Sequence, residues 1–207
     1  MVMRNTSALL IAGDEARFVE EVDYIRRYLL NKVGFDHKKT WTCNHSTNES
    51  VLKTIERFVQ EVNATEKPQD AVVVYSGHGL QGSFCPHPEN PIPYQNLARF
   101  LKEITGRTIF INDSCYSGSC IPAFRDFGIL PEAGLVITSS NDGEESWSNF
   151  FHYMLTGFFK ERLPYQPTEI PFSLTDPLQS SDVASSGLVY QHPQRCGLSL
   201  DHLLFPQ

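Results

Sequence analysis

Hydrophobic and polar positions follow two kinds of pattern along the first 160 residues. Short continuous apolar runs, typical of strands buried on both faces, lie at 7–13, 70–75, 108–112 and 134–138. Residues 39–43 form a weaker run of the same kind. Between the runs, apolar residues recur every three or four positions, which predicts amphipathic helices. These helices span 18–33, 52–62, 97–104 and 148–163. Strands that alternate with helices predict a mostly parallel sheet with helices on both faces.

Local signals place several element ends. Gly34 is expected to end the first helix, and Ser46 with Glu49 three residues later forms a capping-box pattern that opens the second. A polar, proline-rich loop is expected between His78 and Pro93. The tail is rich in Pro and Ser and is expected to be irregular over about 164–186, with strand candidates at 188–190 and 198–200. Without an internal repeat or a linker, we expect one α/β domain over 1–207.

Composition narrows the classes of function. The 207 residues are 41% hydrophobic and 20% charged, as in a globular chain that buries its core without disulfides. The formal net charge is −7 without a long basic run, so we expect neither nucleic acid nor an anionic membrane surface as a partner. The first apolar run is too short for a signal peptide, and no apolar stretch is long enough to span a membrane.

The five cysteines show no disulfide-framework spacing, which predicts a reducing, cytoplasmic location. In such a compartment, a cysteine with a specific role is more often catalytic or metal-binding than part of a structural disulfide. Two Cys-x-His pairs, Cys43/His45 and Cys85/His87, raise the question of zinc. They lie far apart in the sequence and match no zinc-finger spacing, so we expect no metal site there.

Two glycine-rich turns hold the candidate chemistry. The most apolar strands end in Ser76-Gly-His-Gly79 and in Asp113-Ser-Cys-Tyr-Ser-Gly118. Function gathers at the carboxyl ends of parallel strands, so neighbouring strands would bring His78 and Cys115 together. A thiolate is a nucleophile, and an imidazole can take its proton. Either residue alone would more often be structural, whereas the pair favours nucleophilic catalysis. A phosphatase loop would need an arginine at position 121, which is Ile, and no Gly-x-Ser-x-Gly elbow is present.

These motifs resemble the caspase-like cysteine peptidases, which include caspases, metacaspases, legumains and bacterial caspase homologues. The segments that carry the resemblance are 72–79 and 109–118, supported by 8–13, 134–146, 189–193 and 204–206. The resemblance covers nearly the whole chain in the family's order. It implies a three-layer α/β/α sandwich with a mostly parallel six-stranded sheet, strand order 2-1-3-4-5-6 and an antiparallel last strand.

The resemblance also implies a mechanism. His78 would be the general base and acid, and Cys115 the nucleophile that forms a thioester. The backbone N–H groups of Gly79 and Cys115 would form the oxyanion hole. No metal or other cofactor takes part in this chemistry, so we expect none.

Within the family, the turn at 113–118 most resembles that of metacaspases, with Tyr116 where a histidine is common. By this resemblance Asp113 and Ser76 would line an acidic pocket for a basic residue, and Asp23 resembles a further pocket aspartate in the first helix. Carboxylates in a partly desolvated pocket select Arg or Lys through charge-assisted hydrogen bonds. For Asp23, a solvated helix position is an equally good interpretation.

Two departures from metacaspases follow. Many metacaspases bind calcium, but the short loop after His78 offers Glu89 without a cluster of carboxylates, and position 122 is Pro. We therefore expect folding and activity without calcium. Arg125, which follows the nucleophile, is a candidate autoprocessing site, although an ordinary surface arginine is the better interpretation.

The sequence thus predicts a cysteine endopeptidase that cleaves protein or peptide substrates after Arg or Lys. A single dedicated protein is one candidate substrate, and any control would come from a regulatory partner chain, from processing or from a mobile loop. Two alternatives remain open. One is a catalytically silent caspase-like interaction or regulatory module, and the other is transpeptidation by the same dyad.

Overall fold

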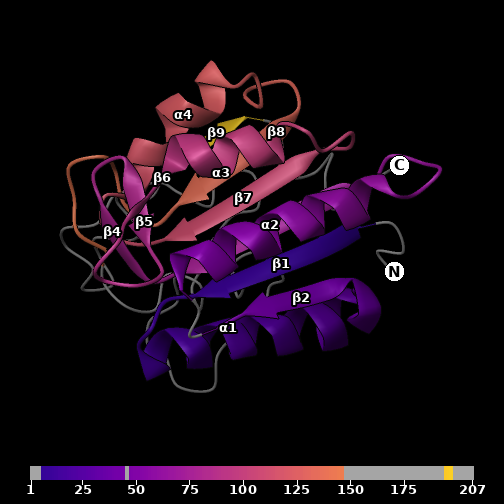
Figure 1. Cartoon of the computed structure of the whole chain (residues 1–207), viewed down its shortest axis with the longest axis horizontal. Helices are drawn as coiled ribbons and strands as arrows, with labels where there is room; N and C mark the ends of the chain where they lie inside the picture. Colours follow the sequence, from indigo (N-terminus) through magenta and orange to yellow (C-terminus); the bar gives the residue numbers. More distant parts are fainter. Residues whose placement is uncertain (1–5, 45–46, 147–193, 198–207) are drawn as a thin grey trace, which may run out of the picture.

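A six-stranded sheet forms the centre of the computed structural model, which describes residues 6–44, 47–146 and 194–197. The strand order is β2-β1-β3-β7-β8-β9 (Figure 1). The strands are β1 (Thr6–Ala12), β2 (Thr40–Cys43), β3 (Asp70–Ser76), β7 (Thr108–Asp113), β8 (Gly134–Thr138) and β9 (Gln194–Gly197). The first five are parallel, and β9 pairs antiparallel with β8. The predicted sheet, with its antiparallel last strand, is confirmed.

The continuous apolar runs form strands because both faces of the sheet are covered. Along β1, Leu9 and Ile11 pack into one hydrophobic cluster, whereas Ala8 and Leu10 pack into another on the opposite face. All four side chains are fully buried. A strand between two helical layers has no solvent face, so it shows no alternation with polar residues.

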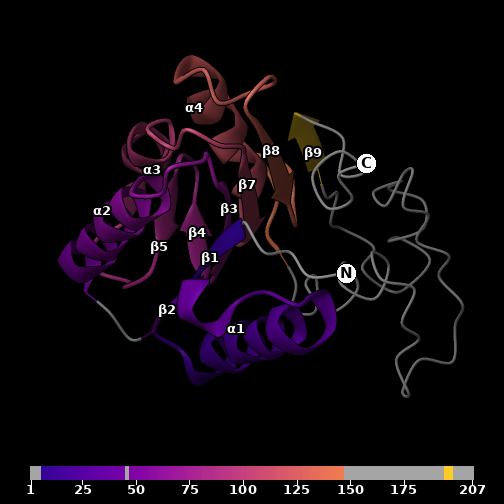
Figure 2. The same ribbon diagram turned by 90° about the vertical axis from the view of Figure 1, so that its right-hand side faces the viewer.

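Helices lie on both faces of the sheet. They are α1 (Ala16–Tyr28), α2 (Asn48–Asn63), α3 (Tyr94–Leu101) and α4 (Ile121–Asp126). The first continues as a π-helical turn, Leu29–Val33, and ends at Gly34 with φ of 85°, as the glycine signal predicted. In Figures 1 and 2, α2, α3 and α4 lie along one side of the sheet, and α1 lies across from them. The expected three layers are present.

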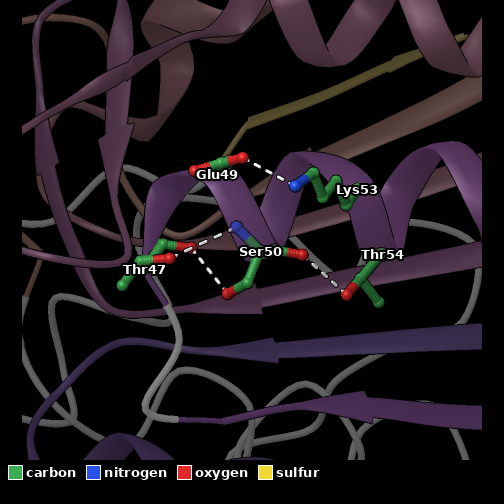
Figure 3. A network of polar contacts seen from close by, with 5 residues as sticks. All are labelled: Thr47, Glu49, Ser50, Lys53 and Thr54. Carbon is green, nitrogen blue, oxygen red and sulfur yellow. Dashed lines mark hydrogen bonds and ion pairs between the residues drawn. The ribbon is translucent and has the colours of Figure 1, made fainter.

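The start of α2 differs from the expected capping box. Thr47 is the N-cap, and its Oγ1 accepts a hydrogen bond from the backbone N–H of Ser50 at 3.3 Å (Figure 3). Glu49 instead forms an ion pair with Lys53, with Nζ and Oε1 2.6 Å apart. Ser46 lies outside the described residues. The capping-box prediction placed the N-cap one residue too early. Ser46 and Thr47 both carry a hydroxyl that can cap a helix, so the sequence does not distinguish them.

The segment after His78 is more ordered than a loop. It forms a second sheet from β4 (His78–Leu80), β5 (Ser83–Cys85) and β6 (Ile92–Pro93). Phe84 and Ile92 are buried in the same cluster as α2 and α3, so this hairpin packs on that side of the main sheet. Within the described part of the chain, no helix is long and apolar enough to cross a membrane. The predicted helix at 148–163, the irregular segment at 164–186 and the strand candidates at 188–190 and 198–200 lie outside it.

Candidate active site

The two candidate turns meet at one edge of the sheet because β3 and β7 are neighbours. Their register pairs Ser76 with Asp113, the last residue of each strand. The backbone N–H of Gly77 donates to the carbonyl of Asp113 at 3.1 Å, which extends the pairing by one step. His78 and Cys115 then line the same pocket. Adjacent parallel strands therefore deliver a histidine and a cysteine to one place, as expected.

Hydrogen bonds from the loop after β8 hold the turn around Cys115. The next residue, Tyr116, has φ of 56°, and its N–H donates to the carbonyl of Glu144 at 2.6 Å. Ser117 follows and is fully buried. Its Oγ accepts from the N–H of Ser140 at 3.0 Å. These contacts keep the half-buried thiol of Cys115 at the pocket surface, where the N–H of Ser146 lies 3.4 Å from Sγ.

The imidazole of His78 is held on two sides. Its Nε2 lies 2.5 Å from Oε1 of Glu15, in the loop between β1 and α1. The ring of Phe18 packs edge-on against it, with ring centroids 5.1 Å apart. The hydroxyl of Tyr75 donates to the backbone carbonyl of His78 at 2.7 Å. Between the described residues, no hydrogen bond joins His78 directly to Cys115.

The backbone of Gly79 passes close to the nucleophile. A Cβ atom at this position would lie 2.2 Å from the carbonyl oxygen of Cys115 and 2.6 Å from Oγ of Ser114. Only glycine permits this approach. Backbone N–H groups near a reacting thiol are what an oxyanion hole requires. The role assigned to the N–H groups of Gly79 and Cys115 remains a prediction.

Two carboxylates line the pocket next to Cys115. Oγ of Ser76 donates to Oε2 of Glu21 on α1 at 2.5 Å, and Oγ of Ser146 donates to Oδ1 of Asp113 at 2.8 Å. Ser76 and Asp113 are both buried. The structure thus places Ser76 and Asp113 in one pocket, and their role in binding substrate stays a prediction.

Asp23 does not lie in this pocket. It is exposed on α1, and the carboxylate that α1 contributes to the pocket lining is that of Glu21. Two residues rotate a helix position by about 200°, so Asp23 points away when Glu21 points inward. The helical spacing in the sequence could have identified Glu21, because it lies three residues after the buried Phe18 and so on the same face of the helix. Asp23 lies five residues after it.

Sequence reasoning also missed Glu15 and Arg17. Nε of Arg17 lies 2.7 Å from Oε2 of Glu15, and its guanidinium lies over the ring of Phe18, 4.6 Å from the centroid. The pKa of Glu15 is below its usual value, mainly because the carboxylate accepts a hydrogen bond from His78. No motif marks these residues. Only their place directly after the first strand, at the sheet edge where His78 emerges, indicated a role.

The other cysteines do not line this pocket. Burial raises the pKa of the Cys120 thiol to about 12 and also raises that of Cys85, so both stay protonated at neutral pH. Cys43 is buried, and Cys196 accepts a hydrogen bond from Arg125 at 3.3 Å. In the described ranges, no group of three or more His, Cys, Asp or Glu side chains is arranged to hold a metal ion.

Arg125, the candidate autoprocessing site, lies within α4. A protease binds its scissile segment in an extended form, so cleavage at this position would require local unwinding of the helix. This placement favours the interpretation of Arg125 as an ordinary surface residue.

Comparison with known structures defines the class of this fold. The chain is similar to caspase-1 from Spodoptera frugiperda, with a TM-score of 0.64 and 14% identity over 95% of this chain and 87% of that one. It is also similar to protein GSU0716 from Geobacter sulfurreducens, with a TM-score of 0.57 and 16% identity over 98% and 97% of the two chains. The fold is therefore the caspase-like α/β fold.

The family follows from the sequence. The model of the peptidase C13 family matches residues 20–176. The chain therefore belongs to the peptidase C13 family and is a caspase-like cysteine peptidase. A search of the curated proteins finds no match. The likeness of the Cys115 turn to metacaspases stays a prediction.

Proposed function

We propose that this chain is a cysteine endopeptidase that uses Cys115 and His78 to cleave polypeptides after Arg or Lys. The observation that carries the specificity is the pair of carboxylates, Glu21 and Asp113, in the pocket that also holds Cys115. The family supports peptidase activity, and the geometry supports the choice of residues.

The reaction begins with proton transfer from the Cys115 thiol to the imidazole of His78. The thiolate attacks the scissile carbonyl carbon, and the N–H groups of Gly79 and Cys115 stabilise the oxyanion. The imidazolium then gives its proton to the leaving amine, which departs and leaves a thioester on Sγ. Water, deprotonated by His78, hydrolyses the thioester, restores the thiol and releases the new carboxylate.

The substrate side chain before the scissile bond would enter between Glu21 and Asp113. These carboxylates now accept hydrogen bonds from the hydroxyls of Ser76 and Ser146. A guanidinium or ammonium would replace these neutral donors with charged ones, so that Coulomb attraction between opposite charges adds to each hydrogen bond. Among the described residues that line the pocket, Arg17 is the one arginine or lysine, and its Nε already pairs with Glu15. An acidic substrate side chain would therefore meet two carboxylates.

Fluorogenic peptides that differ only in this residue test the specificity. Arg and Lys peptides should be cleaved, whereas Asn and Asp peptides should be cleaved far more slowly. Glu21→Gln should lower kcat/KM for the Arg peptide at least about tenfold, because a hydrogen bond between charged groups is lost. Asp23→Asn, on the same helix but exposed, is the matched control and should stay within about twofold. A preference for Asn or Asp would contradict the proposed specificity.

Two further controls test the enzyme itself. Cys115→Ala and His78→Ala should abolish both cleavage and labelling by a thiol-reactive peptide probe, with the fold retained by circular dichroism. A folded wild-type chain that neither cleaves nor labels would support the silent interaction module instead. We also propose that no calcium is needed, so a chelator should leave the rate unchanged. Loss of activity with chelator and its return with calcium would contradict this part.

A further inference from the structure

The loop between β1 and α1 places a carboxylate on the side of His78 where its Nε2 lies. Glu15 is the N-cap residue of α1, and its Oε1 lies 2.5 Å from Nε2. Its second oxygen, Oε2, lies 2.7 Å from Nε of Arg17. Both carboxylate oxygens are therefore engaged, one by the imidazole and the other by a guanidinium.

The chemistry of this contact fixes the proton on His78. An ionised carboxylate only accepts hydrogen bonds, so Nε2 must carry the hydrogen in the contact with Glu15. The pKa of Glu15 lies below its usual value because of this hydrogen bond, so the carboxylate is ionised at neutral pH. In the neutral imidazole the other nitrogen, Nδ1, then has a lone pair available to accept a proton.

We propose that Glu15 is a positioning residue, whose carboxylate holds Nε2–H of His78 so that Nδ1 can take the proton of Cys115. This inference rests on the proposed use of Cys115 and His78. When the thiol proton moves to Nδ1, His78 becomes an imidazolium and Sγ a thiolate. The Glu15 carboxylate stabilises that imidazolium and keeps its proton on Nε2 throughout. The proton on Nδ1 later passes to the leaving amine.

The neighbouring side chains support the same orientation. Phe18 packs edge-on against the imidazole, and the Arg17 guanidinium covers the Phe18 ring. Arg17, Glu15 and His78 thus form one chain of contacts around Phe18. Because the side chains of Glu15 and His78 are about 44% and 42% exposed, solvent screens their attraction. The carboxylate is therefore expected to tune and orient the imidazole without being indispensable.

Several other ionisable groups surround His78. Those of the pocket come from α1 and from the end of β7, and Cys85 is paired with His78 across the β4–β5 hairpin. The groups are Arg17, Glu21, Asp113, Cys115 and Cys85. Of all these and Glu15, only Glu15 forms a hydrogen bond with the imidazole in the described structure. Its removal should therefore affect the orientation of the imidazole most directly.

Kinetics of Glu15→Gln, Glu15→Ala and Glu15→Asp test the proposal. Gln and Ala should lower kcat about 10- to 100-fold, as for the loss of carboxylates that orient metal-bound histidines, with KM little changed. Asp should restore part of the rate. Glu20→Gln, an exposed position on the same helix, is the matched control and should leave kcat and KM unchanged.

A second measurement does not depend on peptidase activity. The 15N signals of the imidazole in NMR should show the proton on Nε2 of His78 in the unaltered chain and a mixture of both tautomers in Glu15→Gln. The rate at which iodoacetamide alkylates Cys115, followed by mass spectrometry of its peptide, should fall in the same variant, because the imidazole is no longer held to accept the thiol proton. If the unaltered chain cleaves nothing, the proposed function fails while these two readouts still test Glu15. An unchanged kcat, or an unchanged imidazole tautomer and alkylation rate, in folded Glu15→Gln would overturn the inference.

Discussion

Gly79 is the residue at which the site tolerates least change. Its missing side chain allows the hairpin backbone to lie against Cys115, and the atoms in the way of a Cβ include a backbone carbonyl, which cannot rotate aside. Gly79→Ala should therefore lower kcat/KM by about 100-fold or more, as when one oxyanion donor is displaced. It should also destabilise the fold by about 1–3 kcal/mol, as overpacking does.

Gly143→Ala is the matched control for this substitution. A Cβ there would meet only Oδ1 of Asn141, at an ordinary 3.6 Å. Urea unfolding and peptide cleavage of the two variants side by side separate crowding at the nucleophile from a general effect of replacing glycine. Full activity in Gly79→Ala would show that the hairpin backbone takes no part in the site.

At the residue scale, the sequence predicted the groups that carry a motif. His78, Cys115, Ser76 and Asp113 sit in two recognisable turns, and the structure brings all four into one pocket. Glu15 and Glu21 belong to no motif. In the sequence, they cannot be distinguished from any other glutamate at the start or on the surface of a helix. Their roles depend on the rotation of α1 against the sheet, which the packing of Phe18 and its neighbours sets.

Among the elements, α3 is joined to the end of β7 by a buried polar network. The hydroxyl of Tyr94, the first residue of α3, accepts a hydrogen bond from Nδ2 of Asn112 at 2.9 Å, and Oδ1 of Asn112 accepts from Ser114 at 3.0 Å. Asn112 is fully buried just before the nucleophile turn. This network therefore positions the backbone that carries Cys115.

Tyr94→Phe should destabilise the fold by about 1–2 kcal/mol, because the buried amide of Asn112 loses its best acceptor. The remaining contact, to the carbonyl of Ser117, is long at 3.4 Å. Urea unfolding of Tyr94→Phe, Asn112→Ala and the double variant forms a thermodynamic cycle. A coupling of about 1 kcal/mol is expected for residues in direct contact, and additive effects would contradict a shared network.

Helices and strands long enough to show an apolar run or a repeating apolar pattern were predictable from the sequence. Short elements were not. The strands β1, β3, β7 and β8 and the helices α1, α2 and α3 followed from their runs and spacings, because each buries an uninterrupted face, whereas the short α4 and β9 were not predicted. The β4–β5–β6 sheet consists of strands of only two or three residues, too short to show any alternation. Its order comes from Phe84 and Ile92, which pack under α2 and α3. That tertiary contact has no local sequence signal.

At the scale of the whole molecule, the buried acids Tyr75, Tyr94 and Cys120 predict how stability depends on pH. Burial raises the pKa of all three, to about 12 for Cys120. In the unfolded chain these groups ionise near their ordinary values of about 9–10. Between those values and the raised ones, the unfolded state binds fewer protons than the folded state. The free energy of unfolding therefore keeps the full contribution of these groups below about pH 9 and falls as the pH rises above it.

The free energy of unfolding should accordingly decrease by about 2 kcal/mol between pH 8 and pH 10, at up to about 1.4 kcal/mol per pH unit for each ionising group. Cys120→Ala separates this effect from the growing net negative charge of the whole chain. The variant loses a constant amount of stability to its cavity at every pH, but its alkaline slope should be shallower because one buried acid is gone. Urea unfolding at several alkaline pH values measures both quantities. Equal slopes in the two proteins would mean that the buried thiol of Cys120 does not contribute to the alkaline loss of stability.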